Sequence, residues 1–264
     1  MSRDSLLLAA DRQQSILALV AERGWVRVSD LTRTFQVSDM TVRRDLVELD
    51  RQGLVSRVHG GARARRNDSR HEPGFDAKRG EMEAAKQTIA QVAATLVTHG
   101  QTIGLSAGTT TATLARYLLD VEDLTVITNS IPVAQVFRES PRPDRTVLLT
   151  GGQRTPSDAL VGELAVRSLT GLNLDVVFLG VHGIEERVGF TCPNLLEADT
   201  NRYLIDAAQH LVVVADHTKW GVVGLVSMAP LSRADTIVMD HGASAEIRAT
   251  LESAISEVLI ADPA

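Results

Sequence analysis

The sequence predicts an α/β protein of two domains, a small N-terminal winged helix-turn-helix and a larger C-terminal α/β domain. Three observations favour this. The first 70 residues hold 13 arginines and nine acidic residues, whereas the remaining residues carry 14 basic and 24 acidic side chains. The first 62 residues have the apolar spacing of short helices followed by a strand. From residue 101, apolar strands alternate with helical stretches. We therefore expect domains at 1–62 and 81–264, joined by a linker at 63–80.

The composition narrows the class of protein. Apolar residues make up 44% of the 264 residues and aromatic residues only 3%, so the cores must be built from Leu, Val, Ile and Ala. Cys192 is the single cysteine and cannot form an internal disulfide, which fits a reducing cytoplasm. No stretch approaches the roughly 18 apolar residues of a membrane helix. We expect a soluble cytoplasmic protein with no membrane partner.

The N-terminal domain begins with a predicted helix over 12–22 and a β-prone segment at 25–28. Ser29 is expected to cap a second helix over 30–35, and Ser38 a third helix that begins at Asp39. On the third helix Val42, Leu46 and Leu49 share one face, which must be buried. A strand at 54–58 and a turn at 59–61 then form a wing.

The third helix is the predicted DNA-recognition helix, because the second helix of a helix-turn-helix pair enters the major groove. Arg43 and Arg44 point away from the buried face, and an arginine fork bonds guanine O6 and N7 together. Hydroxyls and the wing arginine are better placed for phosphates. The candidate DNA-binding residues are Ser29, Ser38, Thr41, Arg43, Arg44, Arg57 and His59.

Three alternatives stay open for this domain. Arg44 and Glu48 are four residues apart and can pair on a solvated face, whereas Arg43 has no such obvious partner. His59 can be a turn residue without a DNA contact. A winged helix can also serve as a protein-docking module.

The C-terminal domain is predicted from continuously apolar runs, which are typical of parallel strands buried on both faces. A helix beginning near Glu81 and ending at Gly100 precedes them. The expected strands are 102–105, 124–128, 145–150, 175–179, 211–215 and 235–239. The expected helices between them are 110–119, 132–138, 163–169 and 194–208.

Polar residues follow several of these strands, at the edge of the sheet where ligands of such folds bind. Gly108, Thr109, Thr110 and Thr111 stand between a strand and a helix, which is the pattern of an anion site and most naturally of a phosphate site. Further groups at strand ends are Thr128, Asn129, Ser130, Gly151, Gly152 and Lys219. The ordinary alternative is that such a turn is only a helix N-terminus, but several turns together favour a polar ligand pocket.

Cofactors and metals are disfavoured. No G-x-G-x-x-G follows a strand and no G-x-x-x-x-G-K-[ST] is present, so no nucleotide cofactor is expected. The seven histidines and one cysteine show no metal-ligand spacing.

The segment "VSDLTRTFQVSDMTVRRDLVELDRQGLVSRVHGGA" resembles the N-terminal signature of DeoR-family bacterial transcription regulators. The matching features are V-S-x-x-T-[IV]-R-R-D-L followed by R-x-H-G-G-A. In the rest of the chain "AGTTT", "TNS", "TGG", "DVVFLGVHGI" and "ADHTKWG" resemble the DeoR sensor domain, which is similar to ribose-5-phosphate isomerase and NagB-like folds.

This resemblance implies a phosphorylated sugar or related metabolite as effector. By position the phosphate would meet residues 108–111 and Lys219. The remaining implied effector residues are Ser106, Thr128, Asn129, Ser130, Gly151, Gly152, Asp175, Gly180, Glu197 and Arg202.

Two departures from the pattern matter. Family members usually carry Asp where this chain has Ser106. The related isomerases carry a catalytic D-G-A-D where this chain has Leu179-Gly180-Val181-His182. Without those acids no catalytic residues are assigned and enzyme activity is not expected.

We therefore expect a transcriptional regulator, a repressor of carbohydrate genes, that binds double-stranded operator DNA and is released by its effector. A palindromic operator requires two-fold protein symmetry, so at least a homodimer is expected. The alternative is a sugar-phosphate isomerase that carries a winged helix.

Overall fold

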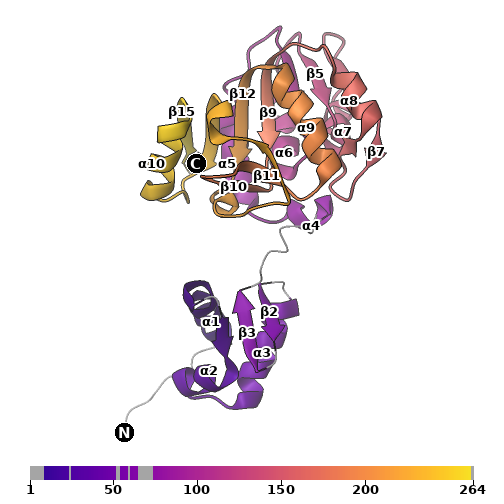
Figure 1. Ribbon diagram of the computed structural model, residues 1–264. Helices are drawn as coiled ribbons and strands as arrows, with labels where there is room; N and C mark the ends of the chain where they lie inside the picture. Colours follow the sequence, from indigo (N-terminus) through magenta and orange to yellow (C-terminus); the bar gives the residue numbers. More distant parts are fainter. Residues whose placement is uncertain (1–8, 24, 52–53, 59, 65–73, 263–264) are drawn as a thin grey trace. The chain divides into compact units, whose positions relative to one another are not determined.

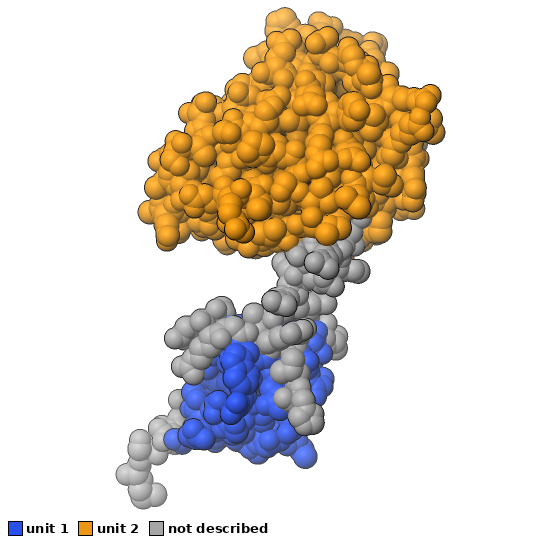
Figure 2. Space-filling view, viewed as in Figure 1, with its two compact units in different colours: residues 1–68 blue, residues 69–264 orange. Residues whose placement is uncertain are grey.

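The computed structural model describes residues 9–23, 25–51, 54–58, 60–64 and 74–262. The chain forms two compact units, residues 1–68 and residues 69–264 (Figure 2). The smaller unit is a winged helix-turn-helix and the larger one a parallel-sheet α/β domain, as the sequence predicted. In the described part of the chain, no helix is long and apolar enough to cross a membrane.

In its described residues the smaller unit contains three helices and a three-stranded antiparallel sheet in the order β1-β3-β2. Its elements are α1 (Ala9–Arg23), β1 (Trp25–Arg27), α2 (Val28–Phe35), α3 (Asp39–Arg51), β2 (Val55–Val58) and β3 (Gly61–Ala64). The predicted apolar face of α3 is confirmed, since Val42, Leu46 and Leu49 are at most 1% exposed. They pack with Ile16 and Leu31 in one core.

Two local predictions for this unit were wrong. α2 begins at Val28 with Arg27 in the N-cap position, so Ser29 lies inside the first turn and caps nothing. The reason is tertiary: the Val28 N–H donates to the Gly60 carbonyl of the wing turn at 2.9 Å, which fixes the start of the helix. The wing also has a second strand, β3, that reaches beyond residue 62.

The larger unit is built on a seven-stranded parallel sheet in the order β15-β14-β12-β9-β4-β5-β6 (Figure 1). Its strands are β4 (Thr102–Leu105), β5 (Thr125–Thr128), β6 (Thr146–Leu149), β9 (Leu174–Gly180), β12 (Ala208–Ala215), β14 (Thr236–Asp240) and β15 (Glu257–Ala261). Smaller pieces are the hairpin of β7 (Gln153–Arg154) and β8 (Leu160–Val161), and an antiparallel sheet of β10 (Gly183–Glu185), β11 (Gly189–Cys192) and β13 (Val226–Ala229).

Helices cover both faces of the large sheet. One core joins alternate strand residues to α5 (Glu83–Ala94), α6 (Thr109–Tyr117) and α7 (Ile131–Glu139). The other joins the remaining strand residues to α8 (Glu163–Leu169), α9 (Leu195–Ala207) and α10 (Ala245–Ala254). α6 and α9 therefore lie on opposite sides of the sheet (Figure 1). The carboxyl ends of all seven strands meet at one edge, where a ligand would be bound.

The predicted linker at 63–80 contains a short helix, α4 (Phe75–Arg79), which belongs to the larger unit. The Phe75 N–H donates to the Pro156 carbonyl at 3.1 Å. Because this helix is only five residues long and is fixed by a partner some 80 positions away, local periodicity could not predict it.

Candidate DNA-binding surface and effector pocket

The amino end of α3 is capped as the sequence predicted. The Thr41 N–H donates to Ser38 Oγ at 3.2 Å, and the two hydroxyl oxygens lie 2.8 Å apart. Ser38 is exposed and Thr41 is half-buried. The cap fixes where the first turn of α3 begins, and therefore which side chains that turn presents to solvent.

The outward side of α3 presents Met40, Arg43, Arg44 and Val47, which recur at helical spacing and are all exposed. Arg43 is paired with Asp39 one turn earlier, by a short contact from Nε and a 3.4 Å contact from Nη2. The expectation that Arg43 has no partner was therefore wrong. Both side chains of this pair are more than half exposed, so solvent competes for it and the guanidinium can be transferred to DNA.

The other candidate DNA residues are spread over the unit. Ser29 is exposed in the first turn of α2, and its carbonyl accepts a bond from the Thr32 hydroxyl at 2.8 Å. Arg57 is exposed on β2, and its backbone N–H donates to Asp50 at 3.3 Å. His59 lies outside the described residues. The small unit therefore exposes Arg57 on the wing as well as Arg43 and Arg44 on α3.

In the larger unit a pocket lies at the carboxyl ends of β4, β9 and β12. It contains six of the predicted effector residues, namely Gly108, Thr109, Thr110, Gly180, Glu197 and Lys219. Gly108 is the N-cap of α6 at φ 154°, a conformation that suits glycine, and it has no side chain to cap the first turn. The N–H groups at the start of α6 are therefore available to an anion.

Three lysine residues line the same pocket as this helix end. The chain has only three lysines beside its many arginines, and Lys78, Lys86 and Lys219 all line the pocket. Lys86 is 4% exposed, and its Nζ donates to the Lys78 carbonyl at 2.6 Å. Burial lowers the pKa of Lys86 most, and the ammonium groups of Lys219 and Lys78 lower it further, against the opposing effect of Asp216. A bound anion would relieve this repulsion.

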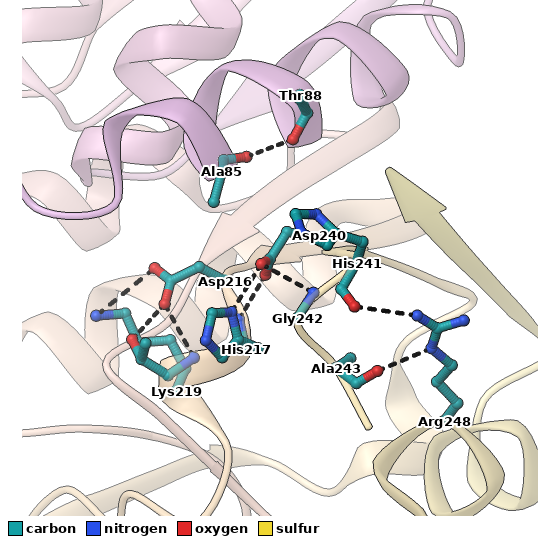
Figure 3. A network of polar contacts seen from close by, with 11 residues as sticks. Ala85, Thr88, Asp216, His217, Lys219, Asp240, His241, Gly242, Ala243 and Arg248 are labelled. Atoms are coloured by element: carbon teal, nitrogen blue, oxygen red, sulfur yellow. Dashed lines mark hydrogen bonds and ion pairs between the residues drawn. The ribbon is translucent and has the colours of Figure 1, made fainter. Parts of the chain in front are cut away.

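A buried polar network fixes Lys219 (Figure 3). Its Nζ lies 3.9 Å from Oδ2 of Asp216, a carboxylate that also caps the short turn His217–Lys219. The next residue, His217, is held by Asp240, which accepts bonds of 2.7 Å from the His217 backbone N–H and from its Nδ1. Burial raises the pKa of Asp240, but these bonds to His217 and the Gly242 N–H outweigh it, so that pKa is lowered. The network positions the Lys219 ammonium at the pocket.

The opposite wall of the pocket is polar but less positive. Ser157 and Glu197 lie together, with Oγ and Oε2 3.3 Å apart. The segment Gly180–His182 and Cys192 complete this wall. A carboxylate, a hydroxyl and an imidazole are suitable partners for the hydroxyl groups of a sugar. Within the described ranges, no group of three or more His, Cys, Asp or Glu side chains is arranged to hold a metal ion.

Three predicted residues shape the pocket from beneath without lining it. Ser106 is fully buried, and its Oγ accepts a bond from the Gly180 N–H at 2.9 Å. Asn129 is also buried and accepts from the Ala107 N–H at 3.0 Å. The Thr111 hydroxyl donates to the Gly108 carbonyl at 3.0 Å. These bonds hold the loop between β4 and α6, so their side chains are committed to the protein.

Two further predicted residues are also buried away from the pocket. The Thr128 hydroxyl donates to the Leu105 carbonyl at 2.7 Å, and Ser130 caps α7. Their placement as effector contacts is corrected, because each polar group already has a partner inside the protein.

Four predicted effector residues lie elsewhere. Asp175 is at the amino end of β9, at the opposite edge of the sheet, where it accepts a bond from the Thr102 N–H at 2.7 Å. Arg202 is half-buried and donates to Asp199 and to the Ser227 carbonyl. Gly151 and Gly152 are exposed beyond β6, and Gly152 is required because any Cβ would lie 2.4 Å from the Val161 carbonyl oxygen. The structure therefore corrects the placement of all four.

The pocket residues that sequence reasoning missed come from other elements, namely Phe75, Lys78, Lys86, Ala107, Ser157, Val181, His182, Cys192 and Pro193. One signal for Lys86 was present. It shares a helix face with Ile89, Ala90 and Ala93, all of them buried, and a lysine on a buried face requires an explanation.

Each of the two units matches a known protein family model. The family model for the "DeoR-like helix-turn-helix domain" matches residues 12–68, and that for the "DeoR C terminal sensor domain" matches residues 81–241. This chain belongs to the DeoR family of transcriptional regulators. The matched regions fall within the winged-helix unit and the α/β unit respectively.

Similar proteins match this chain along most of their length. The chain is 35% identical to an uncharacterized HTH-type transcriptional regulator, YgbI, of Escherichia coli K12, over 89% of this chain and 91% of that protein. It is 32% identical to a putative aga operon transcriptional repressor of Escherichia coli O157:H7, over 95% and 93%. It is 33% identical to the glycerol-3-phosphate regulon repressor of Escherichia coli K12, over 87% and 90%.

The chain also resembles solved structures over about half of its length. A ribose 5-phosphate isomerase A from Methanocaldococcus jannaschii is 19% identical, covering 52% of this chain and 54% of that chain, with a TM-score of 0.39.

Proposed function

We propose that this DeoR-family regulator represses genes of carbohydrate metabolism and leaves its operator when a phosphorylated sugar or related metabolite occupies the α/β pocket. The names of its relatives support the first half, since one is a repressor of the glycerol-3-phosphate regulon and another a putative repressor of the aga operon. The gathering of all three lysines of the chain around the amino end of α6 supports the second half.

The pocket is suited to an anion with a polar, uncharged remainder. The N–H groups of α6 and the ammonium groups of Lys78, Lys86 and Lys219 would hold the phosphate. Glu197, Ser157 and His182 on the opposite wall would then meet the hydroxyl groups. A small, compact ammonium suits this arrangement, because three such groups fit around one tetrahedral anion.

The residues of this wall favour a regulator over an isomerase. An isomerase needs a group that removes a proton from carbon, and the related isomerases place carboxylates in the segment that here reads Gly180-Val181-His182. The backbone and side chains of this segment line the pocket without adding a carboxylate to it. Glu197 is the one acidic residue on the described pocket wall.

On the DNA side, α3 would lie in the major groove with Arg43 and Arg44 at base edges. Ser38, Thr41 and Arg57 would contact phosphates and set the register. Specific recognition of two half-sites would require a homodimer or a larger symmetric oligomer.

Calorimetric titration of the full chain with sugar phosphates and with the same sugars lacking phosphate tests the pocket. We expect binding of at least one phosphorylated compound and none of its parent sugar. Lys219→Met should weaken that binding about tenfold or more, because one charge-assisted contact is lost. Arg138→Met, which removes an exposed cation from α7 outside the pocket, is the matched control. Equal binding of phosphorylated and parent sugars would exclude the proposed anion site.

An isomerase assay distinguishes the regulator from the alternative, a sugar-phosphate isomerase that carries a winged helix. Turnover of ribose 5-phosphate by the wild-type chain, lost in Glu197→Ala, would favour an isomerase and contradict a purely regulatory role.

A further inference from the structure

The strand β6 is an open edge of the seven-stranded sheet, and it is apolar. Its sequence is Thr-Val-Leu-Leu, and all four residues are exposed, with Leu148 at 52%. The opposite edge strand, β15, is different, since only its first residue is exposed. Among the described residues, no further strand pairs with β6.

The backbone of β6 has groups that point outward. The Thr146 N–H donates to the Leu124 carbonyl and the Thr150 N–H to the Thr128 carbonyl, so Thr146, Leu148 and Thr150 direct their backbone groups toward β5. Because successive residues of a strand bond to alternate sides, Val147 and Leu149 direct their N–H and C=O groups to the open edge. Two donors and two acceptors therefore lie ready for another strand.

Both faces of this edge are apolar as well. Leu148 is in register with Ile127, whose side chain is buried in the core on the α8 and α9 side of the sheet. Val147 is in register with Val126, which is buried on the other side. Leu164 of α8 is 64% exposed and lies beside Gly151, just after β6, so it extends the apolar surface on the Leu148 side.

Natural edge strands usually carry a device against pairing, such as a lysine, a proline or an inward charge. β6 has none within its four residues. The nearest charge, Arg145, is turned back to its own unit, where it bonds the Leu119 and Ser140 carbonyls. An apolar edge without protection is a surface that is covered when the protein functions.

We propose that β6 is the interface with a second copy of this chain, paired antiparallel about a two-fold axis that passes beside Leu148. A two-fold axis through an antiparallel strand pair places one residue opposite its own copy. With Leu148 on the axis, Val147 lies opposite Leu149 of the second copy, and all outward donors and acceptors are used in four hydrogen bonds. A two-fold axis placed beside any other residue of β6 leaves some of these outward N–H and C=O groups without a partner.

The second copy is the occupant that fits this surface. An extended peptide would pair with the backbone, but it would leave the apolar side chains on both faces exposed. A second α/β unit brings a continued sheet together with its own Leu148 and Leu164. The use of such a dimer in reading two half-sites rests on the proposed function, whereas the interface itself does not.

The mass of the full chain in solution tests the interface. We expect the wild-type chain to be a dimer or a larger even assembly by light scattering. Leu148→Lys should reduce its mass by a factor of two, because a lysine opposite its own copy is repelled and desolvated. Leu195→Lys on α9, where the native leucine is 61% exposed, is the matched control and should keep the wild-type mass. Unchanged circular dichroism would show that both variants fold.

A cross-link tests the register. Leu148→Cys should form a disulfide between copies under mild oxidation, because opposite residues of a non-hydrogen-bonded pair lie within disulfide range. Thr146→Cys should form far less, and the wild-type chain, with Cys192 buried, none. A monomeric wild type, an unaffected Leu148→Lys variant or dissociation by Leu195→Lys instead would overturn the interface. If a monomeric Leu148→Lys variant still binds phosphate, the β6 interface is not required for the proposed effector pocket, and the two proposals can fail independently.

Discussion

At the scale of single residues, Lys86 gives the clearest link between structure and function. A buried lysine destabilises a fold unless its charge is used, and here the ammonium faces two other ammonium groups with Asp216 nearby. Its pKa is lowered, so folding disfavours the charged form below that pKa, and the penalty fades as pH rises toward the ordinary value of 10.5. Such a residue is explained by a ligand that returns the missing negative charge.

The titration of the lysine side chains follows from this. With isotope-labelled lysine the spectrum contains only three side-chain signals, all from the pocket. We expect one, Lys86, to titrate below 10.5, and inorganic phosphate to raise its pKa. Phosphate affinity should therefore fall as pH rises through the lowered pKa, and Lys86→Met should flatten this dependence. A Lys86 signal that titrates at its ordinary value, with or without phosphate, would refute the account.

Arg43 and Asp45 show how neighbouring residues of one motif take different roles. Arg43 and Arg44 are exposed on α3, whereas Asp45 is 4% exposed and receives Nε and Nη2 of Arg12 at 2.6 and 3.2 Å. Gln13 adds a third contact at 3.3 Å. Asp45 therefore stabilises the unit and does not touch DNA.

At the scale of elements, this buried pair joins α1 to α3, the helix proposed to contact DNA. Asp45→Ala removes the carboxylate to which the buried Arg12 guanidinium donates two bonds and should cost about 3 kcal/mol of the free energy of unfolding. Urea denaturation of the full chain carrying Trp220→Phe, followed by the fluorescence of the remaining Trp25, would measure this. Asp39→Ala removes an exposed carboxylate six residues earlier and should change stability little. Equal loss in the two variants would contradict the structural role of the buried pair.

The comparison of predicted and observed strands and helices shows which of them could be predicted from the sequence. The predicted strands of the large sheet agree with the structure within three residues at each end, because long apolar runs carry the signal of burial on both faces. The strands β7, β8, β10, β11, β13 and β15 and the helices α4 and α10 were not predicted. β10 and β11 form a hairpin of only three and four residues, and the partners of β13 and α4 lie far along the chain.

The pocket was partly predictable for a similar reason. Residues just after strands, such as Gly108 and Lys219, converge because the carboxyl ends of parallel strands meet at one edge. Asp175 was assigned only because the family resemblance implied it, and it lies at the amino end of β9, at the opposite edge of the sheet from the pocket. Lys78 and Lys86 come from helices, whose approach to this edge depends on packing.

At the scale of the whole molecule, we propose that α4 is the segment through which the pocket acts on DNA binding. α4 is the first described element after the winged helix, and it contributes Phe75 and Lys78 to the pocket wall. The Lys86 ammonium already bonds the Lys78 carbonyl, so an anion that attracts Lys86 acts directly on this helix. A tenfold change in DNA affinity requires only about 1.4 kcal/mol of coupling.

We propose that arginines of α3 bind DNA and that an anion bound in the α/β pocket controls this binding. The most direct measurement is fluorescence anisotropy of the full chain on DNA from upstream of its own gene, with and without a panel of sugar phosphates. We predict specific binding that is weakened tenfold or more by one phosphorylated sugar, lost in Arg44→Ala, and insensitive to that sugar in Lys219→Met. Equal weak binding to every DNA fragment, or an effector response that survives Lys219→Met unchanged, would contradict it.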